Sequence, residues 1–275
     1  MEKVVGTLVN VLSLISVNKA VYWVHKLFST PRKGKLQPAH LPEFLQQAKV
    51  ETLVYQGEQV YTYQWHTQAI DKPLILLIHG WESNSARWEA LHTYLGDAFR
   101  LIAFDAPSLG QSKGKNLSVK NYQEVIDLVI QHFQPQGVVA HSLGAFTAFQ
   151  QLSVTSYPSV QKAVILGSFD RFEEILAQYF LLLGYNRRLR QAYRHYIETL
   201  LGQPLANYCS TQATTTMPIP ILCIHDIHDA QVSFQEAIGF HQALQAKNNP
   251  VVTTIDLGHS LQDPLVFETI RTFLS

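Results

Sequence analysis

A serine between an expected buried strand and an expected helix is the most informative feature of the sequence. Ser142 follows an apolar run at 137–141 and precedes a helical pattern at 143–153, with Ala140 and Gly144 two positions to either side. A sharp strand-to-helix turn holds such a serine in a strained backbone conformation, so only small side chains fit beside it. The usual pattern is G-x-S-x-G, and alanine here replaces the first glycine. Because alanine keeps that side chain minimal, the segment predicts that Ser142 is a nucleophile.

A serine nucleophile needs a histidine as base, and the histidine needs a carboxylate that orients it. His259 follows the last expected strand in the segment DLGH, just before the C-terminal helix, and is the expected base. Asp229 follows the preceding strand and is the expected acid, which gives the chain order Ser, Asp, His. Asp226 in the same loop and Asp170 after another strand are the alternative acids.

Two backbone amides are expected to stabilise the oxyanion that forms when a serine attacks a carbonyl group. The amide of Leu143, directly after the serine, is one donor. The loop after the first expected parallel strand contains His79, Gly80 and Trp81. The glycine permits a close backbone approach, and the Trp81 amide is the second expected donor, whereas His79 is expected to hold the loop. A plain turn between strand and loop is the alternative for this segment.

The sequence predicts neither a metal site nor a cofactor site. His225, Asp226, His228 and Asp229 are residue types that bind metals, but their spacing matches no established metal motif, and the acid loop explains two of them better. The chain lacks the G-x-G-x-x-G pattern of dinucleotide-binding folds and the GK[ST] of a phosphate-binding loop.

The elements around these residues alternate between strands and helices. Short apolar runs without polar alternation are expected to be parallel strands whose two faces are covered by helices. These runs lie at 73–79, 99–105, 137–141, 163–167, 220–225 and 251–256. Helical patterns lie at 87–95, 119–133, 143–153, 234–246 and 264–273. With a β-hairpin expected from the alternation at 52–56 and 59–65, this order predicts a doubly wound α/β sheet that binds its ligand at the carboxyl ends of the strands.

About fifty residues between the fourth and fifth of these runs contain no strand pattern. Two helices are expected there, at 171–184 and 187–202, followed by a polar loop at 210–216. The first of these helices is strongly apolar (ILAQYFLLLG). Because the insertion, residues 169–216, follows a strand end, we expect it to form a lid over the site. Helical packing away from any site is the alternative.

The N-terminal residues 1–28 raise the question of a membrane. No residue between Val4 and Val17 is charged, but this stretch is shorter than the roughly 20 residues that a spanning helix needs. Neither a positively charged start nor a small-x-small cleavage site accompanies it. Its apolar residues recur at helical spacing. We therefore expect a helical extension that packs on the domain or its cap, with a peripheral membrane contact and a signal segment as alternatives.

The composition is that of one large globular domain, residues 1–275. The chain has 47% apolar residues, 15% charged residues, and 21 Lys and Arg against 21 Asp and Glu. High hydrophobicity without net charge excludes disorder, and a net charge of zero gives no general attraction to nucleic acid. The two cysteines, Cys209 and Cys223, cannot form a disulfide scaffold, and Cys223 lies in an expected core strand. A cytoplasmic protein that binds no nucleic acid is expected.

Over residues 52–273 the chain resembles serine hydrolases of the α/β-hydrolase fold. The resemblance rests on HGW at 79–81, D-x-P-x-x-G-x-S at 105–112, AHSLG at 140–144, Asp229 and GH at 258–259. It implies an eight-stranded, mostly parallel sheet with early antiparallel strands, helices on both faces, and a lid formed by the insertion. It also implies a triad of Ser142, Asp229 and His259.

The sequence departs from the family pattern at two places. Ala140 replaces a glycine, and Ser108-Leu109 stands where the pattern often has Gly-His. The second loop borders the site in relatives, so the resemblance implies that it affects substrate shape more than the triad. The HGWE and AHSLGA segments are similar to those of bacterial hydrolases of loosely defined substrate.

The expected activity is hydrolysis of a carboxylic ester, or a related acyl bond, of a small and hydrophobic substrate through an acyl-enzyme. The same triad serves thioesterases, C–C hydrolases, amidases and cofactor-free perhydrolases, since fold and triad do not determine the bond. A hydrolase-like binding protein with little turnover is the alternative outside enzymes.

Overall fold

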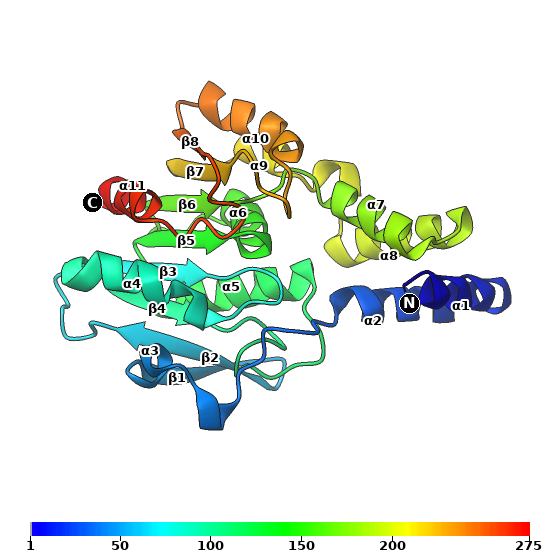
Figure 1. Cartoon of the computed structure of the whole chain (residues 1–275), viewed down its shortest axis with the longest axis horizontal. Helices are drawn as coiled ribbons and strands as arrows, with labels where there is room; N and C mark the ends of the chain where they lie inside the picture. Colours follow the sequence, from blue (N-terminus) through cyan, green and yellow to red (C-terminus); the bar gives the residue numbers. More distant parts are fainter. Residues whose placement is uncertain (1) are drawn as a thin grey trace.

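A mixed sheet of eight strands forms the centre of the computed structural model, which describes residues 2–275. The strands follow the order β1-β2-β4-β3-β5-β6-β7-β8 (Figure 1). Their bounds are β1 Lys49–Tyr55, β2 Glu58–Trp65, β3 Leu74–Ile78, β4 Arg100–Phe104, β5 Gly137–His141, β6 Lys162–Leu166, β7 Ile221–Asp226 and β8 Val251–Thr254. The pairs β1–β2 and β2–β4 are antiparallel, and all other neighbours are parallel. The expected eight-stranded, mostly parallel sheet is confirmed.

The hairpin that starts the sheet turns through two residues with positive φ. Gln56 has a φ of 50° and Gly57 a φ of 81°, and the flanking residues Tyr55 and Glu58 are paired. Two central residues with positive φ match the twist of the strands that they join, as in the preferred two-residue hairpin turns. The expected hairpin is confirmed, but its turn lies at 56–57 and not at the expected 57–58, because Glu58 already pairs with Tyr55.

Alternate residues of each central strand face opposite hydrophobic clusters. In β5, Val138 and Ala140 contact the cluster that includes the helices α5 (Val119–Phe133), α6 (Leu143–Val154) and α10 (Phe234–Ala246). Val139, between them, contacts the cluster that includes α4 (Glu89–Leu95) and α11 (Pro264–Leu274). Helices therefore cover both faces, which is why the strand patterns are continuously apolar.

Short helices complete the connections between these elements. They are η1 (Pro38–His40), α3 (Glu43–Gln46), η2 (Ser85–Trp88) and η3 (Gly96–Ala98).

The insertion contains the two expected helices and two short helical elements that were not expected. Its elements are α7 (Phe172–Leu183), α8 (Arg187–Leu201), η4 (Leu205–Asn207) and α9 (Ser210–Thr214). The prediction of a polar loop at 210–216 is wrong for the residues of α9. Their hydroxyl groups are satisfied by carbonyls: Ser210 Oγ donates to Phe169 at 3.1 Å and Thr214 Oγ1 to Ser210 at 2.9 Å. With these groups paired, α9 can bury Ala213 in the core.

The two N-terminal helices pack against the insertion. α1 (Glu2–Ile15) and α2 (Val17–Ser29) are separated by Ser16, whose hydroxyl accepts from the Lys19 amide at 3.4 Å. They lie beside α7 and α8 at one end of the molecule (Figure 1). The α1 backbone approaches α7 so closely that a Cβ on Gly6 would lie 1.6 Å from the Leu183 carbonyl oxygen. None of the described helices combines the length and the apolar character that crossing a membrane requires.

Candidate active site

Ser142 stands at the turn between β5 and α6, at the carboxyl end of the central strands. Its φ of 57° and ψ of −126° lie in a region that residues other than glycine rarely occupy. Hydrogen bonds hold the turn on both sides: the Ser142 amide donates to the Leu166 carbonyl at 2.9 Å, and the Phe146 amide donates to the Ser142 carbonyl at 3.0 Å. The strained strand-to-helix turn expected from the sequence is therefore present.

Small residues flank Ser142 because neighbouring backbone segments lie against the turn. A Cβ on Gly144 would lie 2.1 Å from the His79 carbonyl oxygen, and a Cβ on Gly80 would lie 2.9 Å from the Ser142 Cβ. Separations this short leave no room for a side chain at either glycine. Ala140, which stands where the pattern has its first glycine, is fully buried within β5. The sheet accommodates its methyl group.

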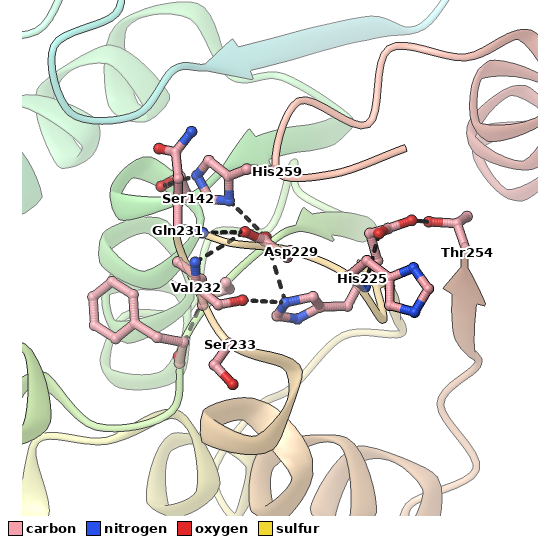
Figure 2. Close-up of polar contacts among 12 residues, drawn as sticks. Ser142, His225, Asp229, Gln231, Val232, Ser233, Thr254 and His259 are labelled. Atoms are coloured by element: carbon pink, nitrogen blue, oxygen red, sulfur yellow. Dashed lines mark hydrogen bonds and ion pairs between the residues drawn. The ribbon is translucent and has the colours of Figure 1, made fainter. Parts of the chain in front are cut away.

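His259 connects the Ser142 hydroxyl to a carboxylate (Figure 2). Its Nε2 atom lies 2.9 Å from Ser142 Oγ, and its Nδ1 atom lies 2.7 Å from Asp229 Oδ2. An ionised carboxylate can only accept a hydrogen bond, which assigns the ring proton to Nδ1 and leaves Nε2 free to accept from the serine. The loop after β8 presents this histidine through Asp256 and Gly258, which both have positive φ.

The carboxylate of Asp229 is buried and hydrogen-bonded at both oxygens. Oδ1 accepts from the amides of Gln231 at 2.8 Å and Val232 at 2.9 Å, while Oδ2 faces His259. Burial alone would raise the pKa of Asp229, but the hydrogen bonds from His259 and the two amides outweigh it and hold the pKa below its ordinary value. The carboxylate is therefore ionised at neutral pH and can orient the imidazole.

The other two acid candidates, Asp226 and Asp170, are bonded elsewhere. Asp226 Oδ2 accepts from the Thr254 hydroxyl at 2.7 Å. Asp170 accepts from the amide and the hydroxyl of Thr211, at 2.7 and 2.8 Å. Of the three aspartates, Asp229 is the one that contacts the histidine beside the serine.

Two backbone amides near Ser142 donate no hydrogen bond to any residue within 2–275. One is that of Leu143, the first residue of α6, whose N–H has no partner inside the helix. The other is that of Trp81, which is bonded to Gly80 and therefore lies beside the same turn. Neither amide is therefore occupied by an acceptor within the described part of the chain.

His79 holds the loop that carries Trp81. Its Nδ1 lies 2.8 Å from the Gly80 carbonyl oxygen, and its Nε2 accepts from the Ala106 amide at 3.0 Å. The Tyr122 hydroxyl donates to the His79 carbonyl at 2.6 Å. Burial lowers the pKa of His79 to about 4, so the ring is neutral and its proton lies on Nδ1. The His79 side chain thus connects the loop after β3 to the loop after β4, and it holds the Trp81 loop as expected from the sequence.

The loop after β4 is organised around the buried carboxylate of Asp105. A Cβ on Gly110 would lie 2.0 Å from this carboxylate, which explains the glycine in the D-x-P-x-x-G segment. Ser108, where the family pattern often has glycine, has a φ of 61°. Both Ser108 and Leu109 are buried. The departure from Gly-His thus changes the interior of this loop.

Two further histidines, His141 and His225, hydrogen-bond backbone carbonyl groups of the active-site loops, a role that the sequence did not reveal. His141 Nε2 lies 2.7 Å from the His259 carbonyl oxygen, and His225 Nε2 lies 3.0 Å from the Val232 carbonyl oxygen. Carbonyl oxygens only accept, so both rings carry a proton on Nε2. His225 Nε2 also lies 3.6 Å from Asp229 Oδ2 (Figure 2). The nearness of each histidine to the serine or the acid in sequence was a usable signal, but the carbonyl partners come from the fold.

The possible metal ligands at the end of β7 and in the following loop form hydrogen bonds with different partners and do not converge on one point. His228 Nδ1 lies 2.7 Å from Asp256 Oδ1, away from the imidazole of His225. Among residues 2–275, no group of three or more His, Cys, Asp or Glu side chains is arranged to hold a metal ion.

Comparison with protein families matches residues 75–267 to the model of the alpha/beta hydrolase family. Curated relatives include two pimeloyl-[acyl-carrier protein] methyl ester esterases. The protein from Vibrio vulnificus is 30% identical over 109 residues, which are 39% of this chain and 41% of the relative. The protein from Citrobacter koseri is 24% identical over 166 residues, which are 58% of this chain and 64% of the relative. The chain thus matches less than two thirds of the length of either relative.

Solved structures share the same fold at low sequence identity. Est1E from Butyrivibrio proteoclasticus with ferulic acid bound has a TM-score of 0.66 and 17% identity, with coverage of 82% of this chain and 97% of that chain. The thioesterase domain of the curacin biosynthetic pathway has a TM-score of 0.61 and 16% identity, with coverage of 82% and 98%. The family match extends over more than two thirds of the chain and includes the strands from β3 to β8, apart from the first residue of β3. The chain belongs to the alpha/beta hydrolase family.

Proposed function

We propose that this protein is a serine hydrolase that cleaves a carboxylic ester, or a related acyl bond, through an acyl-enzyme. The observation that carries the proposal is the unbroken series of contacts from Ser142 Oγ through both ring nitrogens of His259 to Asp229. The naming of curated relatives as methyl ester esterases supports an ester as the substrate class.

The first half of the reaction transfers the acyl group to the serine. Ser142 Oγ attacks the carbonyl carbon of the substrate while its proton moves to His259 Nε2. Asp229 stabilises the imidazolium that forms, because its ionised carboxylate lies on Nδ1. The tetrahedral intermediate then collapses: the bond to the leaving alcohol breaks, and the alcohol oxygen takes the proton from Nε2.

The second half of the reaction releases the acid. Water gives a proton to His259 Nε2 and attacks the acyl carbon, and the proton returns to Ser142 as the ester bond to the serine breaks. In both halves the carbonyl oxygen becomes negative, and the free amides of Leu143 and Trp81 are the donors assigned to it. Removal of one such donor typically costs about 100- to 1000-fold in kcat.

The substrate proposed for this site is small and hydrophobic. Leu143 and Trp81 bring apolar, half-buried side chains to the surroundings of Ser142. The apolar residues of α7 contribute less support, because Leu176 and Phe180 are buried in the cluster shared with the N-terminal helices. The site would therefore favour an acyl group without charge.

The insertion, residues 169–216, is proposed to act as a lid. It follows β6 directly, and Gly167 at the end of that strand lies against the catalytic base. A Cβ on Gly167 would lie 3.4 Å from His259 Nδ1. A segment that leaves the sheet from this position is well placed to limit access of water and substrate to the serine.

Covalent labelling tests the proposal. A fluorophosphonate probe is expected to label the wild-type protein and not Ser142→Ala, and an adduct that persists in Ser142→Ala would contradict it. A panel of acyl p-nitrophenyl esters and thioesters of graded length then identifies the bond. A clear optimum among the esters is expected, whereas faster thioester cleavage would indicate a thioesterase. Ser142-dependent labelling with only trace activity on the whole panel would point to C–C, amide or perhydrolase chemistry, or to a binding protein.

A further inference from the structure

The outward face of α1 is apolar although it is exposed. The inward residues Gly6, Val9 and Ser13 are buried on the side that faces the insertion. Four apolar residues at helical spacing occupy the opposite side, with exposed fractions between 53% and 82%; this α1 stripe consists of Val4, Leu8, Val11 and Ile15. An apolar stripe on a helix is normally buried against another element. Within residues 2–275, however, nothing covers the α1 stripe.

α2 adds an exposed face of a different composition. Its exposed residues include two lysines and two aromatic residues, and this α2 face consists of Lys19, Tyr22, Trp23 and Lys26. The Lys26 ammonium lies 4.9 Å from the centre of a Trp23 ring. Lysine beside tryptophan and tyrosine is typical of the zone where a bilayer meets water, because each side chain has an apolar body and a polar end. α1 and α2 pack on α7 and α8 from the same side (Figure 1), so their exposed faces point away from the insertion.

The positive charge of the protein is concentrated at this end of the molecule. α1, α2 and residues 171–201 together contain eight Lys and Arg against four Asp and Glu, while the rest of the chain contains thirteen against seventeen. A chain of zero net charge thus has one end with a net positive charge.

We propose that the α1 stripe and the α2 face bind the surface of an anionic phospholipid bilayer, with α1 lying in the plane of the interface. Apolar side chains would enter the headgroup region, and the surrounding lysines and arginines would attract the lipid phosphates, the combination by which interfacial helices bind. A second copy of this chain is a poorer occupant. A symmetric contact places the same patch on both subunits, so two basic ends would repel each other. The inference is independent of the proposed chemistry at Ser142.

Vesicle sedimentation tests the apolar contribution. The full-length protein is expected to bind vesicles with about 30% phosphatidylglycerol at least about tenfold more strongly than vesicles of phosphatidylcholine alone. The double variant Leu8→Gln/Ile15→Gln is expected to lose about tenfold or more of this affinity. The matched control is Ile70→Gln/Leu265→Gln, because Ile15 and Ile70 are 82% and 81% exposed, and Leu8 and Leu265 are 66% and 79% exposed. The control should bind like the wild type, and circular dichroism should show equal helix content in both variants.

Charge variants test the electrostatic contribution. Lys19→Gln/Lys26→Gln is expected to weaken binding to the anionic vesicles by roughly thirtyfold, since each lysine near such a surface contributes about fivefold. Lys49→Gln/Lys72→Gln, which removes two exposed lysines elsewhere, should change the affinity by less than about twofold. Raising the salt concentration from about 0.05 to 0.5 M should release the wild-type protein.

Three outcomes would overturn the proposal. The first is that neither kind of vesicle binds the wild-type protein. The second is that Ile70→Gln/Leu265→Gln or Lys49→Gln/Lys72→Gln loses as much vesicle affinity as the corresponding variant of α1 or α2. The third is a wild-type dimer in solution that becomes a monomer in Leu8→Gln/Ile15→Gln, because the α1 stripe would then be an interface between copies.

Discussion

Gly144 lies directly against the carbonyl group of His79, and a Cβ at Gly144 would be 2.1 Å from that oxygen. This contact joins the first turn of α6 to the loop that carries Trp81. The same turn holds Ser142, and the same loop brings the Trp81 amide beside it. One backbone contact thus determines the separation between the proposed nucleophile and the proposed oxyanion donors.

Substitution of Gly144 should therefore damage both stability and activity. Gly144→Ala is expected to lower the free energy of unfolding by about 2–3 kcal/mol, because backbone has to move to admit the methyl group. Ester hydrolysis should fall by more than about tenfold, since small shifts of catalytic groups are costly. Gly239→Ala is the control, because it lies in α10 and its Cβ would meet atoms no closer than 3.4 Å. Gly239→Ala should raise the free energy of unfolding by about 0.5–1 kcal/mol, because alanine is favoured over glycine inside a helix. Urea unfolding and initial rates measure these effects, and equal stability of the two variants would refute the explanation.

Three aspartate variants identify the acid. Asp229→Asn should lower kcat by about a thousandfold or more, because a neutral amide favours the wrong imidazole tautomer. Asp170→Asn should retain kcat within about threefold, since its carboxylate bonds Thr211 on a different segment. Asp226→Asn should mainly lower stability, by about 1–3 kcal/mol, through its lost hydrogen bonds. If Asp226→Asn abolishes turnover while Asp229→Asn remains active, the assignment of the acid is wrong.

His225 is expected to be a positioning residue for Asp229. Its hydrogen bond to the Val232 carbonyl holds the loop whose amides bind the Asp229 carboxylate. His225→Phe should lower kcat by roughly ten- to a hundredfold with little change in KM, because the acid moves while substrate contacts remain. His225→Gln, whose amide can still donate to the carbonyl, should recover part of the loss. If both variants lose the same amount of kcat, the hydrogen bond is not the cause.

His241, next to His225, is expected to make stability depend on pH. Burial lowers its pKa to about 4, whereas an imidazole in the unfolded chain titrates near about 6.5. Between these two values the unfolded state binds more protons, so the free energy of unfolding falls as the pH falls from about 6.5 to 4. Below about pH 4 His241 is protonated in both the folded and the unfolded state, and its contribution to the free energy of unfolding falls no further.

A single variant isolates this contribution. The wild-type protein should lose about 2 kcal/mol of stability through His241 between pH 7 and pH 5, and His241→Leu should lack that part of the decrease. Neither ring nitrogen of His241 has a hydrogen-bond partner among the described residues, so the leucine is expected to be tolerated at pH 7. Urea unfolding at the two pH values measures the difference, and an unchanged pH dependence in His241→Leu would contradict the prediction.

The sequence by itself determined the order of the strands and main helices and the approximate bounds of most of them. β5, α5 and α10 occupy the residues expected for them, because apolar periodicity is a local property that a short segment carries alone. The Ser142 turn was also predictable, since a strained strand-to-helix turn requires small residues within two positions of the serine. The position of His259 after the last strand followed from the same reasoning.

Only the tertiary structure decided which groups meet. Asp170, Asp226 and Asp229 all lie at or after strand ends, and the direction in which each carboxylate points depends on contacts with distant segments. The helix α9 forms in a polar segment because neighbouring carbonyls accept its hydroxyl groups. The apolar residues of α1 recur at helical spacing, and the packing on α7 and α8 left one apolar side of the helix exposed. Local patterns specify elements, whereas side-chain partners depend on which distant segments the sheet order brings together.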